Sequence, residues 1–316
     1  MKNKNIVFLG TPEFAACILE GLLLENYNVI AVVSQPDKPV GRKRILTPTP
    51  VKEVAVKYNI PVYQPVSLRK EYDFLKEMDI DMLITAAYGQ ILPQAVLDLA
   101  KVNNINVHAS LLPLHRGGAP IHRAIINGDE KTGVTIMEMV NKMDAGRMYA
   151  KKEVLIDKNV NTTELFKQLQ VVGKELLLEV LPDLFQDKIE GIPQDESLAT
   201  FSFNIKREEE KIDFSKSTLQ VHNLIRGLCE VPGAYCLYKE KEFKIYKSNI
   251  FSIVDDDVPV GSLKIEGKNR LLVKCNDGYL ELLEVKPEGK GKMDVKSFLN
   301  GCKKEELVLE ILKWKK

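Results

Sequence analysis

The chain has 316 residues, which is longer than one typical domain, so we expect two domains. Its 45 Lys and Arg residues nearly balance its 44 Asp and Glu residues, for a formal net charge of +1. This balance argues against a protein that wraps a polyanion but leaves room for local basic patches. The five cysteines include no Cys-x-x-Cys pair, so neither a zinc site nor a disulfide framework is indicated.

The N-terminal residues lack the apolar core of a signal peptide, and no apolar run approaches the ~20 residues of a membrane-spanning helix. We therefore expect a cytoplasmic protein with reduced thiols and no membrane association.

The first elements form a strand–helix–strand unit. The apolar run Ile6–Leu9 predicts a strand, the amphipathic stretch 13–26 a helix, and the β-branched run 29–34 a second strand. Such a unit implies a parallel sheet. The turn after the first strand, Gly10-Thr11-Pro12, lacks the Gly-x-Gly-x-x-Gly fingerprint, which argues against a dehydrogenase that binds a nicotinamide cofactor.

A long loop is expected over residues 35–50. It contains four prolines and four basic residues, with only Asp37 to offset their charge. A solvated linker is the simpler interpretation, but a loop of this length inside a compact domain is usually functional or disordered. Cationic side chains on a proline-stiffened loop suit contacts with phosphates.

The following region predicts helices and strands in alternation. The run 82–87 is apolar throughout, as expected for a strand in a sheet that is covered on both faces. The other elements expected here are helices over 51–58, 67–77 and 93–100 and a strand over 60–63.

Two polar side chains end the next predicted strand, 102–107. Residues i and i+2 of an extended chain point to the same face, so Asn106 and His108 would lie side by side. A Pro- and Gly-containing turn follows, which is the usual anatomy of a site in an open α/β sheet. Satisfied structural residues remain the alternative interpretation. Asp144, in a loop expected after a strand over 133–139, is either a turn former or the carboxylate of the same site.

The C-terminal part has a different pattern. A long helix over 162–181 is followed by a linker and one more helix over 219–227. Short strands with turns then predict a small barrel, with strands expected over 236–238, 243–246, 249–254, 271–274 and 279–285.

The central motif resembles the signature of the folate-dependent formyltransferases. The matching residues are Asn106-x-His108-x-Ser110-Leu111-Leu112-Pro113, then Arg116-Gly117-x-x-Pro120-Ile121, and later Asp144-Ala145-Gly146. The resemblance runs nearly end to end and implies an α/β fold in two parts. A Rossmann-like parallel-sheet catalytic domain would span 1–190, a linker 191–206, and an OB-like β-barrel that binds tRNA 207–316.

The resemblance also implies the chemistry. The chain most resembles those family members that formylate an aminoacyl-tRNA. This resemblance implies transfer of the formyl group of 10-formyltetrahydrofolate to methionine on initiator tRNA. Asn106, His108 and Asp144 would be catalytic, with no metal. The pterin pocket would include Ile91, Leu92, Ser110, Leu111, Leu112 and Pro113, and the tRNA contacts would include Lys38, Arg42, Lys43, Arg44, Lys290 and Lys292.

Other functions remain open at this point. A sugar-amine formyltransferase or a formyltetrahydrofolate hydrolase would use the same chemistry, and a non-catalytic RNA-binding protein would not. The basic loop and the stretch Gly289–Met293 favour tRNA. The family often has Asn-Pro-Trp-Pro-Gly before its barrel, where this chain has Cys229-Glu230-Val231-Pro232-Gly233, so contacts at that corner differ. We expect a monomer.

Overall fold

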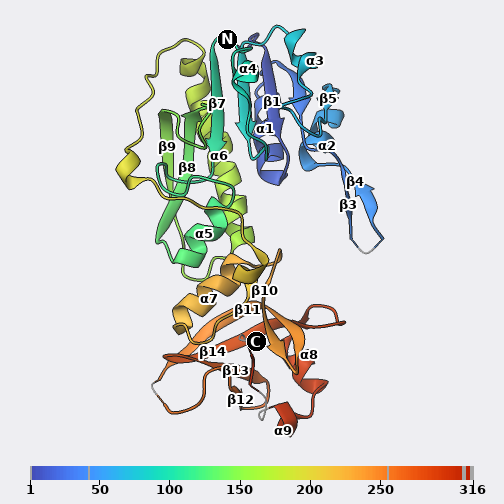
Figure 1. The fold of residues 1–316 in the computed structure, drawn as a ribbon, viewed down its shortest axis with the longest axis vertical. Coiled ribbons are helices and arrows are strands. Elements are labelled where there is room, and N and C mark those ends of the chain that lie inside the picture. The colour runs from blue at the N-terminus through green and yellow to red at the C-terminus, as the bar shows by residue number, and fades with distance from the viewer. Residues whose placement is uncertain (1, 42, 255, 308–310, 314–316) are drawn as a thin grey trace. The chain divides into compact units, whose positions relative to one another are not determined.

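The computed structural model describes residues 2–41, 43–254, 256–307 and 311–313 (Figure 1). The chain divides into two compact units. The first comprises Met1–Pro120, Lys131–Leu155 and Phe166–Phe203, and the second comprises Ile121–Glu130, Ile156–Leu165 and Asn204–Lys316. Two short segments inside the predicted first domain, 121–130 and 156–165, therefore belong to the second unit.

The first unit contains a seven-stranded sheet. Five strands are parallel, as the strand–helix–strand pattern predicts, and two antiparallel strands extend one edge. The last of these, β9, was not predicted. In spatial order the strands are β5 (Val62–Tyr63), β2 (Val29–Val33), β1 (Ile6–Gly10), β6 (Met82–Ala86), β7 (Asn103–His108), β8 (Lys131–Glu138) and β9 (Met148–Leu155).

Helices pack on this sheet because its central strands are apolar on both faces. β1 and β6 are buried at every position. On one face, Phe14 of α1 (Glu13–Leu24) meets Phe166 of α6 (Thr162–Leu184) edge to face, with ring centroids 6.3 Å apart. The remaining helices are α2 (Pro50–Lys57), α3 (Asp73–Lys76) and α4 (Gln94–Leu97). The helix predicted over 67–77 is wrong in extent, since only its last part is helical.

The basic segment 35–50 is a hairpin rather than a plain loop. Strands β3 (Lys38–Val40) and β4 (Ile45–Thr47) pair antiparallel, with Lys38 opposite Thr47. Strands β3 and β4 lie apart from the main sheet of the first unit (Figure 1). The next helix, α2, begins at Pro50 and is capped by the Thr49 hydroxyl, which accepts from the Lys52 backbone N–H at 3.3 Å.

The second unit is built on an antiparallel sheet. Its strands are β10 (Ala234–Tyr238), β11 (Lys241–Ile253), β14 (Gly278–Pro287), β13 (Arg270–Cys275) and β12 (Leu263–Glu266), in that order, with β15 (Met293–Asp294) paired to β14. The two strands predicted over 243–246 and 249–254 are one long strand, β11, whose register shifts near Lys247 and Ser252. The helices are α5 (Pro120–Asn127), α7 (Thr218–Gly227), α8 (Val295–Asn300) and α9 (Lys304–Leu307).

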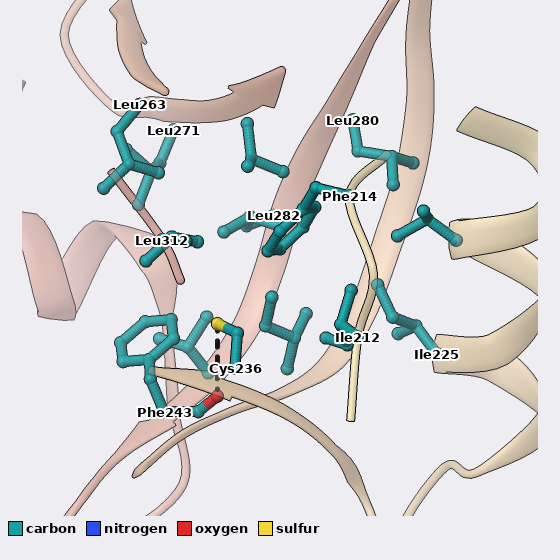
Figure 2. Close-up of a cluster of buried hydrophobic side chains, with 14 of the residues drawn as sticks. Ile212, Phe214, Ile225, Cys236, Phe243, Leu263, Leu271, Leu280, Leu282 and Leu312 are labelled. Atoms are coloured by element: carbon teal, nitrogen blue, oxygen red, sulfur yellow. Dashed lines mark hydrogen bonds between the residues drawn. The ribbon is translucent and has the colours of Figure 1, made fainter. Parts of the chain in front are cut away.

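An apolar cluster forms the core of this unit (Figure 2). Phe243 of β11 and Leu282 of β14 lie inside it, and the Cys236 thiol donates to the Phe243 carbonyl at 3.6 Å. Ile126 of α5 packs against the cluster from a distant part of the sequence. Among the described residues, no helix combines the length and apolar character that crossing a membrane requires.

Candidate active site

His108 is the last residue of β7, and its imidazole is buried. Nε2 lies 3.0 Å from the carbonyl oxygen of His115. Because a carbonyl can only accept, Nε2–H is the donor and carries the proton of the neutral ring. Nδ1 therefore holds the lone pair, and it lies 3.7 Å from Oδ2 of Asp144. A proton taken up by this imidazole would reside between Nδ1 and the Asp144 carboxylate.

Asp144 lies in the loop between β8 and β9. Its backbone φ is +48°, a left-handed conformation that asparagine and aspartate adopt more often than other residues with a Cβ. Oδ2 accepts from the backbone N–H of Gly117 at 2.8 Å. Gly117 must be glycine, since its φ is +121° and a Cβ there would lie 2.7 Å from the Ser202 carbonyl oxygen. Within the described chain, Oδ1 of Asp144 accepts no hydrogen bond, so this oxygen is available to a substrate.

Asn106 lies two residues before His108 on the same face of β7. Thr85 stands opposite it on the neighbouring parallel strand β6. The buried Thr85 hydroxyl has three acceptors within reach of its one proton: the Ile105 carbonyl at 3.3 Å, the Met139 sulfur at 3.0 Å and, nearest, Oδ1 of Asn106 at 2.9 Å. This contact fixes which way the carboxamide points, and no acceptor for its NH₂ group lies in the described part of the chain. Asn106 therefore presents an oriented, uncharged donor.

The turn after β7 is held by Thr135 of β8. Its hydroxyl donates to the Ser110 carbonyl at 2.7 Å and accepts from the Leu112 N–H at 3.1 Å. The Ser110 hydroxyl donates to the Leu114 carbonyl at 2.7 Å, so it is used within the protein. Leu111 and Pro113 are half-buried, and Leu112 is buried against Met137 and Met148.

The other two residues predicted for the pterin pocket follow β6, the parallel neighbour of β7. Ile91 is exposed, whereas Leu92 is buried in the core of the first unit. Carboxyl ends of parallel strands share one edge of a sheet, so these residues and the turn after β7 belong to the same edge.

The cationic residues predicted to contact tRNA fall into two groups. Lys38, Lys43 and Arg44 are exposed on the β3–β4 hairpin, and Arg42 lies outside the described residues. In the second unit Lys290 is exposed, but Lys292 is paired at 2.7 Å with Glu230 and at 3.4 Å with Glu284. The charge of Lys292 is therefore already compensated.

Sequence reasoning missed the role of the segment 192–202, which it assigned largely to a linker. The structure places this segment against the turn 113–119. The Nδ1 atom of His115 is 2.7 Å from the Ser202 hydroxyl, and the Arg116 guanidinium binds Gln194 and Glu196. Arg116 was visible only as part of a motif, and no sequence signal marked Gln194. No cluster of His, Cys, Asp or Glu side chains able to hold a metal ion occurs among the residues described.

The first unit thus carries Asn106 and His108 at the end of β7, with Asp144 of the β8–β9 loop 3.7 Å from His108, and the chain continues into an antiparallel sheet. The chain belongs to the formyl transferase family: residues 4–181 match Formyl transferase, and residues 204–303 match its C-terminal domain. The predicted family is confirmed.

Among its relatives are methionyl-tRNA formyltransferases. That of Staphylococcus epidermidis is 44% identical over 311 residues, covering 98% of this chain and 99% of the relative. That of Listeria monocytogenes is 48% identical over 301 residues, covering 94% and 96%.

Solved structures of more distant proteins share the fold. A sugar 3N-formyl transferase, determined with dTDP and 5-N-formyl-THF, matches with a TM-score of 0.68 at 19% identity, covering 91% of this chain and 99% of its own. The N-formyltransferase of Helicobacter canadensis, determined with folinic acid and dTDP-3-aminofucose, has a TM-score of 0.66 at 19% identity and covers 92% and 100%.

Proposed function

We infer that the chain transfers the formyl group of 10-formyltetrahydrofolate to the amino group of methionine on initiator tRNA. The observation that carries this inference is the His108–Asp144 pair at the end of β7, in a chain whose methionyl-tRNA formyltransferase relatives match it over nearly its whole length. In the reaction the amine forms a bond to the formyl carbon, and the bond from that carbon to folate N10 breaks.

We assign the oxyanion contact to Asn106. The formyl oxygen gains negative charge as the amine attacks, and the NH₂ group that Thr85 orients is an uncharged donor suited to it. Losing one such donor typically lowers kcat by about 10²–10³.

We assign the proton of the attacking amine to His108 and Asp144 acting as a unit. His108 keeps one nitrogen on the His115 carbonyl and the other beside Asp144, 3.7 Å from Oδ2. The positive charge that arrives on the imidazole is then balanced by the carboxylate, and the same proton can be passed to N10 as the leaving group departs. The nucleophile is supplied by the substrate, which explains why no Ser or Cys nucleophile is needed.

We place the folate along Ile91, Leu92 and the turn Ser110–Pro113, for two reasons. These residues follow β6 and β7, which are neighbouring parallel strands. Thr135 holds the turn in one shape, so the binding surface is formed before the ligand arrives. Since the Ser110 hydroxyl already donates to Leu114, the backbone of the turn is the better partner for a pterin.

We propose that tRNA is bound by the β3–β4 hairpin and the second unit. Three of the hairpin's cationic side chains are exposed together, and Lys290 lies exposed between two glycines. Lys292 would have to exchange Glu230 for a phosphate. Because aminoacyl-tRNA is a cytoplasmic substrate, we propose that the enzyme acts there, as a monomer.

We also propose that the antiparallel sheet of the second unit is an OB-like barrel. The segment 311–313 bridges both of its edges: Leu237 of β10 pairs with Lys313, and Ser262, just before β12, pairs with Ile311. Such bridging closes a sheet on itself. As functional boundaries we propose a catalytic part over 1–190, a connection over 191–206 that belongs to the first unit as far as Phe203, and a tRNA-binding part over 207–316.

The test is a formylation assay with purified protein, 10-formyltetrahydrofolate and methionine-charged initiator tRNA. We expect formyl-methionyl-tRNA from the wild type and about 10²–10³ less from Asn106→Ala. Folate binding without product would redirect the search to sugar amines. Equal activity of both proteins would refute the assigned site.

A further inference from the structure

The two loops of the active site are fastened by a segment far along the chain, residues 192–202, which we call the strap. Its backbone runs beside the turn that follows β7. The Arg116 N–H donates to the Thr200 carbonyl at 2.9 Å, the Ser202 N–H to the Arg116 carbonyl at 2.7 Å, and the Ala119 N–H to the Ser202 carbonyl at 2.9 Å. The strap is therefore part of the first unit and fixes the backbone on both sides of Gly117.

Gln194 of the strap connects this turn to the loop of Asp144. Its Nε2 donates to the carbonyl oxygens of Asp144 and Gly146, both at 2.8 Å. Its Oε1 accepts from Nε and Nη2 of Arg116 at 3.0 and 2.8 Å. Both donors and the acceptor of the carboxamide are thus used. A glutamate would place an oxygen against two carbonyls, and a lysine would offer Arg116 no acceptor.

Arg116 holds Gln194 in a fixed position, because the Arg116 side chain is buried with an exposed fraction of 0%. Its charge is compensated by Glu196, with Nη2 2.8 Å from Oε1. Glu196 also binds Lys142, which lies in the loop of Asp144, at 2.9 Å. The Arg116 hydrogen bond, followed by that of Lys142, lowers the pKa of Glu196 to about 2, so the carboxylate stays charged at physiological pH.

Asp144 needs such support. Its φ of +48° is left-handed, a conformation that aspartate tolerates better than most residues with a Cβ but that is still less favourable than the ordinary helical region, and such a backbone persists where its surroundings hold it. Gln194 holds its carbonyl oxygen, and Gly117, next to Arg116, holds its carboxylate. We propose that Gln194, anchored by Arg116, is a positioning residue that sets the distance between Asp144 and His108. This proposal rests on the proposed function.

The test is a double-mutant cycle of Gln194→Met and Asp144→Asn. Methionine keeps the length of the side chain and removes all four hydrogen bonds. In the wild-type background we expect kcat to fall by about tenfold to a hundredfold, the scale of a misplaced catalytic group, with KM for both substrates within about twofold. In the Asp144→Asn background the same change should lower kcat by less than about threefold, because Gln194 acts through Asp144.

Gln186→Met is the matched control, since this glutamine donates to the Pro182 carbonyl at 3.0 Å near the end of α6; its kcat should not change. Additive losses of kcat in the cycle, or a rise in KM alone, would overturn the proposal. Glu196→Gln gives a second test, because glutamine keeps a hydrogen-bonding side chain of the same shape beside the buried Arg116 guanidinium. It should lower kcat severalfold with KM unchanged, and an unchanged kcat in a variant that melts like the wild type would count against the network. A wild type without formylation activity would instead refute the proposed function.

Discussion

Replacing Asp144 with asparagine removes one negative charge from the active site and nearly preserves its shape. The new carboxamide oxygen can still accept from the Gly117 N–H, which now lies 2.8 Å from Oδ2. What disappears is the attraction between the carboxylate and the imidazolium that forms when His108 takes a proton. At the observed separation of 3.7 Å and an effective dielectric constant of about 20, that attraction is roughly 4 kcal/mol.

Because the charge on His108 develops in the transition state, most of this energy should appear in kcat. Roughly 4 kcal/mol corresponds to about a thousandfold slower reaction. The assay is steady-state formylation of methionyl-tRNA, with kcat and KM measured separately for tRNA and folate. The matched control is Asp187→Asn, since Asp187 is also a turn aspartate with a left-handed φ, +53°. A kcat for Asp144→Asn within tenfold of the wild type would refute the assigned role of the ion pair.

Three further outcomes are expected. Thr85→Val removes the hydrogen bond that orients Asn106, which should lower kcat roughly twofold to tenfold; a thermal melt that shifts without any loss of kcat would contradict this. Burial, followed by the charge of Arg226, lowers the pKa of His222 in the second unit below its usual 6.5. Neutral His222 therefore contributes its full stability to the folded protein above pH 6.5, and this contribution is lost as pH falls through the lowered pKa, because the unfolded chain takes up the proton more readily. The melting temperature of His222→Gln should then fall less on acidification than that of the wild type. The exposed hairpin cations Lys38, Lys43 and Arg44 should each be replaced by alanine. The slope of log affinity for tRNA against log salt concentration should then fall by about one unit for each phosphate that the hairpin no longer binds, and an unchanged slope would exclude the hairpin as a tRNA contact.

The sequence predicted best those elements whose burial is uniform. β1 and β6 are buried at every position, and their apolar runs needed no tertiary information. β9 was missed because it is an edge strand whose middle, Lys151–Glu153, is exposed and charged. The hairpin was missed because Pro39 interrupts its first strand, and its pairing does not show as an alternating pattern.

The candidate site was predictable only where its residues are neighbours in the chain. Asn106 and His108 share a face of one strand by the two-residue period alone. Arg116 and Gln194 are 78 residues apart, and nothing local indicates that one carboxamide joins two loops. The same holds for Thr85, whose contact with Asn106 depends on the register between β6 and β7.

The way the chain divides between the units has a consequence for dissecting it. Residues 121–130 and 156–165 belong to the second unit although they precede the strap in sequence. Ile126 packs on the second core, and Arg226 of α7 donates to the Val160 carbonyl at 2.8 Å. A fragment that ends at residue 203 would leave both segments without these partners. A chimera that takes its C-terminal region from a relative would therefore also need that relative's residues on α5 and in 156–165. These two segments and the C-terminal region have to be exchanged together.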